Sequence, residues 1–231
     1  MGYLLLEGGA EFGGRMSEPD RIGLDLAGGL NVPVRILPTA AAPDQNHRRA
    51  GGNGKRWFAS LGATDVEVTY VVDSATANDE SIANELRTAK LIYLLGGFPG
   101  FTGRTLANSK AWDAALDAYR NGAVIAGSSA GAMVLCEHYF DPYEGKILRG
   151  LNLIPNACVI PHHGPGTHRW AKDILRQLPG VTLIGIAEQT GMVDDGNLSA
   201  WTVSGRGEVT VYSGESVSRH GRGETFSITK S

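Results

Sequence analysis

The sequence predicts an α/β fold in which a mostly parallel sheet carries helices on both faces and antiparallel strands close the C-terminal part. Short apolar runs alternate with stretches of helical spacing, and this alternation is typical of parallel pairing. After residue 186 the apolar runs are separated by Gly-rich turns, which is typical of antiparallel strands. A chain of 231 residues that is 42% hydrophobic can bury one sizeable core, so we expect a single domain over residues 1–231.

Five apolar runs in the first part of the chain are expected to form the parallel strands. They cover residues 3–6, 34–37, 66–72, 91–95 and 124–126. Between them, residues 18–30, 46–61, 79–89 and 104–120 place apolar side chains at a spacing near 3.6, which predicts helices. The acidic residues Asp79 and Glu80 suit the start of the third of these helices. Residues 182–186 predict a further strand, and residues 198–203, 208–212 and 224–228 predict the closing antiparallel strands.

Composition argues against several classes of function. The net charge is −3 and no run of basic residues occurs, so we expect neither nucleic-acid binding nor membrane-surface binding. No stretch approaches the ~18 apolar residues of a membrane-spanning helix. Residues 1–6 are typical of a first strand rather than a signal peptide. Cys136 and Cys158 lack metal-ligand spacing, so we expect two buried thiols in a cytoplasmic protein.

The segment Gly127-Ser-Ser-Ala-Gly131 carries the clearest chemical signal. It follows the apolar run 123–126 and precedes a predicted helix, and a G-x-S-x-G turn between a strand and a helix is the pattern of a nucleophile elbow. Glycine is needed on both sides because the tight turn brings backbone atoms together. The sequence therefore predicts Ser129 as a nucleophile at a helix N-terminus, where backbone amides can stabilise negative charge.

A serine nucleophile needs a base, and the base needs a partner that fixes its tautomer. His162 and His163 follow a short apolar strand and a proline, which is a rigid place from which to present an imidazole. Four carboxylates are candidates for the partner: Glu137, Asp141, Glu144 and Glu188.

An oxyanion hole needs two backbone donors aimed at one point. The N–H of Ala130, directly after the nucleophile, is the first candidate. Gly96 and Gly97 end the predicted strand 91–95, and the Gly97 amide can face a substrate with no side chain in the way.

Four segments together resemble the serine peptidase family that includes aspartyl dipeptidase (peptidase E) and cyanophycinase. They are Leu6-Glu-Gly-Gly-Ala-Glu11, Leu94-Leu-Gly-Gly97, Gly127-Ser-Ser-Ala-Gly-Ala132 and Ile160-Pro-His-His163. The resemblance runs from residue 3 to about residue 195. It implies a flavodoxin-like, class I glutamine-amidotransferase-like fold and a Ser-His-acid hydrolase without metal or other cofactor. Carried over by position, it implies Ser129 as nucleophile, His162 as base, and Gly97 and Ala130 as oxyanion donors. It also implies Glu144 first and Asp141 second as the acid.

Several positions depart from the family pattern, and they bear on the substrate. Phe98 and Pro99 follow the paired glycines, where members that cleave after aspartate usually have a polar residue. His163 stands where the family has an aromatic residue, which leaves His163 open as an alternative base. The arginines after the histidine are reduced to Arg169 and Arg176. We expect Phe98, His163 and Arg169 to contact substrate. Glu188 lies in a segment similar to one of cyanophycinase and stays an alternative acid.

The leading hypothesis is a serine peptidase of small peptides, a dipeptidase or terminal exopeptidase that acts through an acyl-enzyme as a monomer or homodimer. A second hypothesis is an esterase of α/β-hydrolase order, with Ser129, Asp194 or Asp195, and His220. A third is a catalytically silent amidotransferase-like protein that binds a small ligand or a partner subunit.

Overall fold

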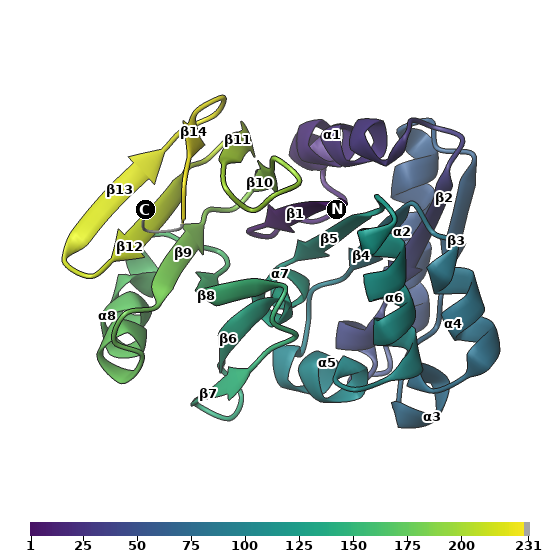
Figure 1. The fold of residues 1–231 in the computed structure, drawn as a ribbon, viewed down its shortest axis with the longest axis horizontal. Coiled ribbons are helices and arrows are strands. Elements are labelled where there is room, and N and C mark those ends of the chain that lie inside the picture. The colour runs from purple at the N-terminus through teal and green to yellow at the C-terminus, as the bar shows by residue number, and fades with distance from the viewer. Residues whose placement is uncertain (229–231) are drawn as a thin grey trace.

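Eight strands form the first sheet, in the order β14-β11-β10-β1-β5-β4-β2-β3 (Figure 1). The computed structural model describes residues 1–228, except for the side chains at positions 168 and 169. Within this sheet the neighbouring pairs β1-β5, β5-β4, β4-β2 and β2-β3 are parallel, and β10, β11 and β14 continue beyond β1 in antiparallel pairing. The strands are β1 (Tyr3–Glu7), β2 (Pro33–Leu37), β3 (Asp65–Val68), β4 (Leu91–Leu94), β5 (Val124–Ser128), β10 (Thr190–Asp194), β11 (Trp201–Gly205) and β14 (Thr225–Phe226).

A second sheet of six strands has the order β13-β12-β9-β8-β6-β7. Its central strands β6, β8 and β9 are parallel, while β7, β12 and β13 flank them in antiparallel pairing. The strands are β6 (Cys136–Asp141), β7 (Lys146–Arg149), β8 (Ile154–Ile160), β9 (Thr182–Ile186), β12 (Val209–Ser213) and β13 (Ser216–His220). The predicted class, a largely parallel α/β fold with antiparallel strands near the C-terminus, is confirmed, although the division into two sheets was not predicted.

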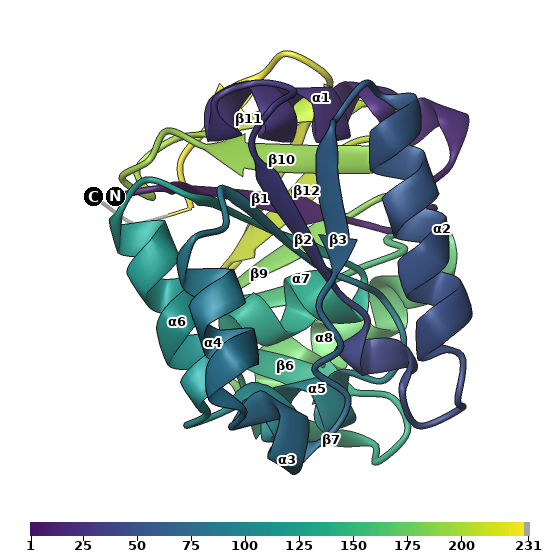
Figure 2. The same cartoon turned by 90° about the vertical axis from the view of Figure 1, so that its right-hand side faces the viewer.

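Helices cover both faces of the first sheet (Figure 2). On one face α1 and α2 bury Leu24 and Phe58 in a cluster that also holds Leu5 of β1. On the other face α4, α6 and α7 pack on Leu4 and Leu6. The Leu-Leu-Leu run of β1 is apolar throughout because a parallel strand is covered on both sides. These helices are α1 (Ser17–Ala27), α2 (His47–Ser60), α4 (Glu80–Arg87), α6 (Lys110–Arg120) and α7 (Ala130–Leu135).

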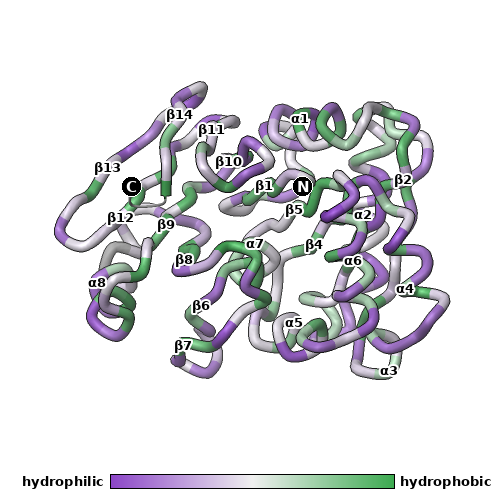
Figure 3. Tube along the Cα trace, viewed as in Figure 1, coloured by the Kyte–Doolittle hydropathy of each residue, from purple (hydrophilic) through white to green (hydrophobic). Residues whose placement is uncertain are grey.

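The largest apolar cluster joins the two sheets, since it contains Leu6 and Ile125 of the first and Ile184 and Val211 of the second. This shared core favours one folding unit. Helix α8 (His168–Gln177) packs Ile174 against the other face of the second sheet. Hydrophilic segments gather at outer turns such as the one between β6 and β7 (Figure 3). The remaining short elements are α3 (Ser74–Ala77), α5 (Pro99–Leu106) and the 3-10 turns Gly14–Met16, Thr39–Ala41 and Pro165–Thr167.

Two predicted helices differ from the structure. The helix predicted at 104–120 is divided into α5 and α6, because Asn108 adopts a left-handed conformation (φ 56°) and the Ser109 hydroxyl accepts the Trp112 N–H at 3.1 Å to start a new helix. The helix predicted after the elbow is short: it ends at Leu135, and the chain passes directly into β6. Within residues 1–228, no helix is long and apolar enough to cross a membrane. Both cysteines are free and buried.

Candidate active site

Ser129 lies at the tight turn between β5 and α7. Its backbone has φ 49° and ψ −112°, a conformation that L residues rarely adopt, and its N–H donates to the Glu7 carbonyl at 3.0 Å. A Cβ at Gly131 would lie 2.2 Å from the Leu94 carbonyl oxygen, and one at Gly127 would lie 2.6 Å from the Gly131 carbonyl carbon. Only glycine therefore fits two residues before and two residues after Ser129, as the G-x-S-x-G pattern predicts.

The His162 imidazole meets this serine from the second sheet. Its Nε2 lies 2.8 Å from the Ser129 Oγ. His162 directly follows β8 and Pro161, and its backbone N–H donates to the Gly8 carbonyl at 2.7 Å. Gly9 lies against the imidazole, since a Cβ there would come 2.3 Å from Cε1 and 2.5 Å from Nδ1. The loop after β1 thus fixes both the backbone and the ring of His162.

Glu188 completes a chain of three side chains. Its Oε1 lies 2.5 Å from the His162 Nδ1, so one imidazole contacts a hydroxyl through one nitrogen and a carboxylate through the other. Strands β8 and β9 are parallel neighbours, so the residues that follow them emerge at the same edge of the second sheet. The His162 and Glu188 side chains are 47% and 53% exposed, which leaves the group accessible to a substrate. Such an imidazole can take a proton from the hydroxyl while the carboxylate holds its tautomer.

The other predicted acids have different partners, which corrects the preference for Glu144. Glu144 forms an ion pair with Arg104 at 2.6 Å, in the turn between β6 and β7. Asp141 is buried and accepts the backbone N–H groups of Tyr143 and Glu144. The cause is the early end of α7 at Leu135: the segment after it becomes a β-hairpin, and its carboxylates serve the turn.

The predicted substrate contacts are only partly near the serine. His163 is 7% exposed, and its Nε2 lies 3.0 Å from the Tyr212 hydroxyl. Its ring therefore packs beside strand β12 of the second sheet. Phe98 stacks on Tyr143 with ring centroids 4.4 Å apart. Arg169 belongs to α8, but its side chain lies outside the described part of the chain.

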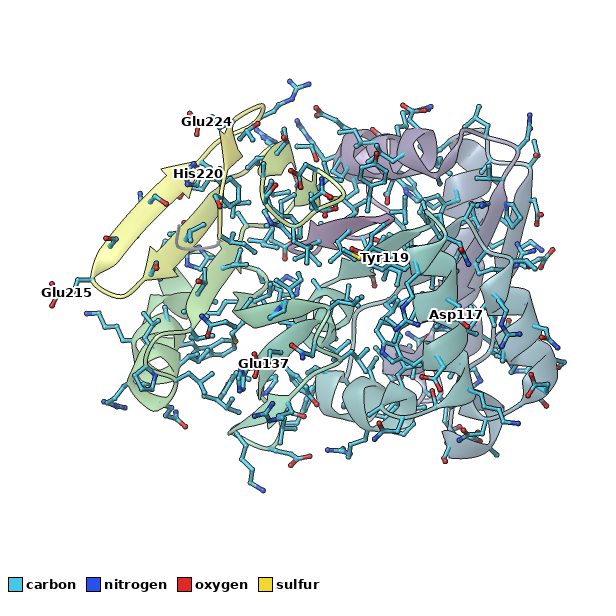
Figure 4. All side chains as sticks on the ribbon, in the orientation of Figure 1. Asp117, Tyr119, Glu137, Glu215, His220 and Glu224 are labelled. Atoms are coloured by element: carbon cyan, nitrogen blue, oxygen red, sulfur yellow. The ribbon has the colours of Figure 1, made fainter. Side chains whose placement is uncertain are left out.

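The residues of the esterase hypothesis are not assembled with Ser129. His220 lies on β13 (Figure 4). There it stacks on Phe226 and contacts Ser218. Asp194 accepts the Leu4 N–H at 2.6 Å, and Asp195 accepts backbone N–H groups of its own turn. Asp194 therefore holds strand β1 and Asp195 holds its own turn, so both carboxylates have a structural role. This corrects the esterase hypothesis, which needed one of them beside His220.

Backbone donors flank the serine on the side of the first sheet. The Ala130 N–H stands at the start of α7, and Gly97 follows β4 with φ 138°. Within residues 1–228 the Gly97 amide donates to no protein acceptor. A Cβ at Gly97 would lie 2.3 Å from the Ala40 carbonyl oxygen, so glycine is required here. The Glu11 carboxylate accepts the Gly96 N–H at 3.0 Å and thereby holds this loop, and burial raises the pKa of Glu11.

A cavity of about 260 Å³ opens beside Ser129, His162 and Gly97. It lies between α7, the hairpin β6–β7, the end of β8 and helix α8, and most of its lining side chains are apolar. A substrate bound here would reach both the hydroxyl and the imidazole.

Comparisons with known proteins identify the family of the chain. The sequence profile of peptidase family S51 matches residues 4–198. The chain belongs to peptidase family S51. Among solved structures, this S51 peptidase is similar to a peptidase from an acI-B1 Actinobacterium, with a TM-score of 0.87 and 28% identity over 98% of this chain and 97% of that one. It also shares its fold with a putative peptidase E protein from Listeria monocytogenes EGD-e, with a TM-score of 0.60 and 19% identity over 95% of this chain and 98% of that one. No curated protein matches.

This S51 peptidase is therefore a serine peptidase with a peptidase E-like fold. Sequence reasoning did not single out the contact of Gly9 with the imidazole or the contact of Glu11 with the Gly96 amide. One signal could have found them: both follow β1, and ligands in open parallel sheets bind beyond the carboxyl ends of the strands.

Proposed function

We propose that this S51 peptidase hydrolyses small peptides through an acyl-enzyme on Ser129, with His162 as base and Glu188 as the acid that orients it. The observation that supports this proposal is the continuous contact from the Ser129 Oγ through His162 to Glu188, at 2.8 Å and 2.5 Å. Both contacts lie within hydrogen-bonding reach, so a proton can pass from the hydroxyl to the imidazole without rearrangement.

The proposed reaction has two halves. In the first, the Ser129 Oγ attacks the peptide carbonyl carbon and its proton passes to the His162 Nε2. The Gly97 and Ala130 N–H groups donate to the oxyanion, and the amine leaves with the proton from His162. In the second, His162 takes a proton from water, the hydroxide attacks the ester, and the carboxylic acid departs as Ser129 recovers its proton. Glu188 stays ionised and stabilises the imidazolium in both halves.

Small peptides suit the site because the cavity of about 260 Å³ lies below the roughly 300–1,000 Å³ of pockets for drug-sized ligands. A dipeptide or a chain terminus fills such a space, while a long folded substrate does not. We keep the monomer or homodimer as the expected assembly and peptides as the expected partner.

The test uses Ser129→Ala, with Ser128→Ala as the matched control at the neighbouring buried position. Each purified protein is incubated with a dipeptide library and, separately, with a fluorophosphonate that reacts with activated serines. We expect turnover and labelling in the wild type and in Ser128→Ala, and neither in Ser129→Ala. Turnover by Ser129→Ala at the wild-type rate would refute the mechanism, and absence of labelling and turnover in the wild type would favour a binding protein.

A further inference from the structure

The cavity beside Ser129 has an apolar floor and walls. Its side chains include Met133, Phe140, Val159, Ile160, Trp170 and Ile174. Met133 lies on α7, one turn beyond the nucleophile, and Val159 and Ile160 are the last residues of β8 before Pro161 and His162. The elements that position the serine and the imidazole therefore also form the floor of the cavity.

Apart from the imidazole of the proposed base His162, the described lining of the cavity offers no cationic partner to an acidic side chain. None of the described residues that line it is Lys, Arg, Asp or Glu. The nearby Arg104 is held in an ion pair by Glu144, and Arg104 does not line the cavity. A carboxylate transferred from water into this space would lose hydration without gaining a Lys or Arg partner from the described lining, which is unfavourable. An apolar side chain would instead remove its own surface and that of the wall from water.

Aromatic rings form the rim. Phe140 and Trp170 lie with ring centroids 5.7 Å apart, and Tyr143 lines the cavity while stacked on Phe98 at 4.4 Å. Trp170 and Tyr143 are 41% and 64% exposed, so both rings are accessible at the rim. A planar side chain entering between these rings would make offset or edge contacts with them. Phe98 thus acts by supporting Tyr143.

We propose that this cavity is a specificity pocket for an apolar, preferentially aromatic, side chain on a residue that flanks the scissile bond. The inference rests on the proposed function, because the pocket selects substrates for the same serine. It assigns a substrate class, peptides with Phe, Tyr, Leu or Met beside the scissile bond, and excludes aspartate and glutamate there.

The first experiment measures kcat/KM of the wild type on two matched dipeptide series, X-Ala and Ala-X, with X varied over Phe, Leu, Ala, Asp and Arg. We expect Phe or Leu to exceed Asp by ~10²-fold or more in one series, since burying a carboxylate without a paired cation is costly while burying an apolar side chain is favourable. Preference for Asp in either series, with no preference for Phe or Leu, would overturn the inference.

The second experiment alters the pocket. Trp170→Ala removes one wall, and Lys172→Ala, an exposed position on the same helix outside the pocket, is the control. We expect Trp170→Ala to lower the Phe-to-Ala ratio of kcat/KM roughly tenfold, and Lys172→Ala to leave it unchanged. An unchanged ratio in Trp170→Ala would contradict the pocket. Arg169→Ala is included because a loss of acidic-peptide hydrolysis in that variant would show that Arg169 supplies a cation.

A binding arm separates this inference from the proposed function. Calorimetry of the Ser129→Ala variant with Phe and Asp peptides reports the pocket even when no hydrolysis occurs. Tighter binding of the Phe peptide supports the pocket, and equal or tighter binding of the Asp peptide overturns it. Absence of turnover in the wild type together with Phe-selective binding would overturn only the catalytic proposal.

Discussion

Two buried carboxyl groups behind Ser129 predict that the protein loses stability as the pH rises toward neutrality. Glu7 on β1 and Asp20 on α1 are both fully buried. The Tyr93 hydroxyl donates to Glu7 Oε2, and the Trp57 Nε1–H donates to Asp20 Oδ2 at 2.7 Å. The other oxygens, Glu7 Oε1 and Asp20 Oδ1, accept from no donor in the described structure, and we therefore expect the two neighbouring carboxyls to share a retained proton.

The direction of the effect follows from where that proton is held. Burial raises the pKa of Asp20 from 3.8 to about 7, and burial together with the charge of Asp20 raises the pKa of Glu7 well above its ordinary value. The folded chain therefore binds protons that the unfolded chain has already released. Stability is highest below the unfolded pKa and falls as pH rises through the folded pKa.

The loss of unfolding free energy can be worked out from the pKa of Asp20 by itself. At about 1.4 kcal/mol per pH unit, a rise in pKa from 3.8 to about 7 corresponds to ~4 kcal/mol of unfolding free energy lost between those pH values. Glu7 adds to this loss in the same direction. Against a typical stability of about 5–15 kcal/mol, the effect is large enough to measure.

The perturbation is Asp20→Asn, which keeps the shape of the side chain and an oxygen that can accept from Trp57 while removing the titrating group. Asp25→Asn, an exposed position on the same helix, is the control. Urea unfolding is followed by circular dichroism at several pH values from 4 to 8. We expect wild type and Asp25→Asn to share the decline, and Asp20→Asn to show a slope that is shallower by about 1.4 kcal/mol per pH unit. Parallel curves for wild type and Asp20→Asn would refute the retained proton.

Two further predictions concern the site itself. Glu188→Gln should lower kcat by ~10⁴-fold because an amide can hold the wrong tautomer of His162, while Glu144→Gln, which removes only the ion pair with Arg104, should stay near the wild-type rate. Equal losses in both variants would contradict the assignment of the acid. Gly9→Ala should reduce kcat/KM by ~10²-fold with the far-ultraviolet circular dichroism unchanged, since the added Cβ would displace the His162 imidazole. Gly14→Ala is the control, because a Cβ at Gly14 meets nothing within 4 Å. Full activity of Gly9→Ala would show that the ring does not depend on this contact.

The sequence was sufficient where the chemistry depends on neighbours along the chain. The turn around Ser129 needs glycines two residues away on each side, and a strand before and a helix after it, all of which are local patterns. The parallel strands were predictable for the same reason, because each is an apolar run bounded by turn residues. The position of His162 directly after β8 also followed from a local apolar run and a proline.

The partner of His162 could not be predicted in this way, because it depends on which strands are neighbours. Glu188 meets His162 only because β9 pairs with β8 in parallel, across the whole of helix α8 in the sequence. The preferred candidate, Glu144, was closer along the chain, but the β6–β7 hairpin directs it to Arg104. Periodicity reports which segments are strands, and it does not report their order in a sheet.

The division into two sheets has a consequence for how the site is held. Ser129 comes from the first sheet, and His162 and Glu188 come from the second, so the 2.8 Å contact between hydroxyl and imidazole spans the junction. One backbone hydrogen bond of Gly8 crosses the same junction: its carbonyl accepts the His162 N–H at 2.7 Å, while its N–H donates to the Thr190 carbonyl of β10, within the first sheet, at 3.0 Å. A Cβ at Gly8 would lie 2.1 Å from the Ala187 carbonyl oxygen. The close approach of the two sheets at this glycine therefore sets the distance on which the proposed proton transfer depends.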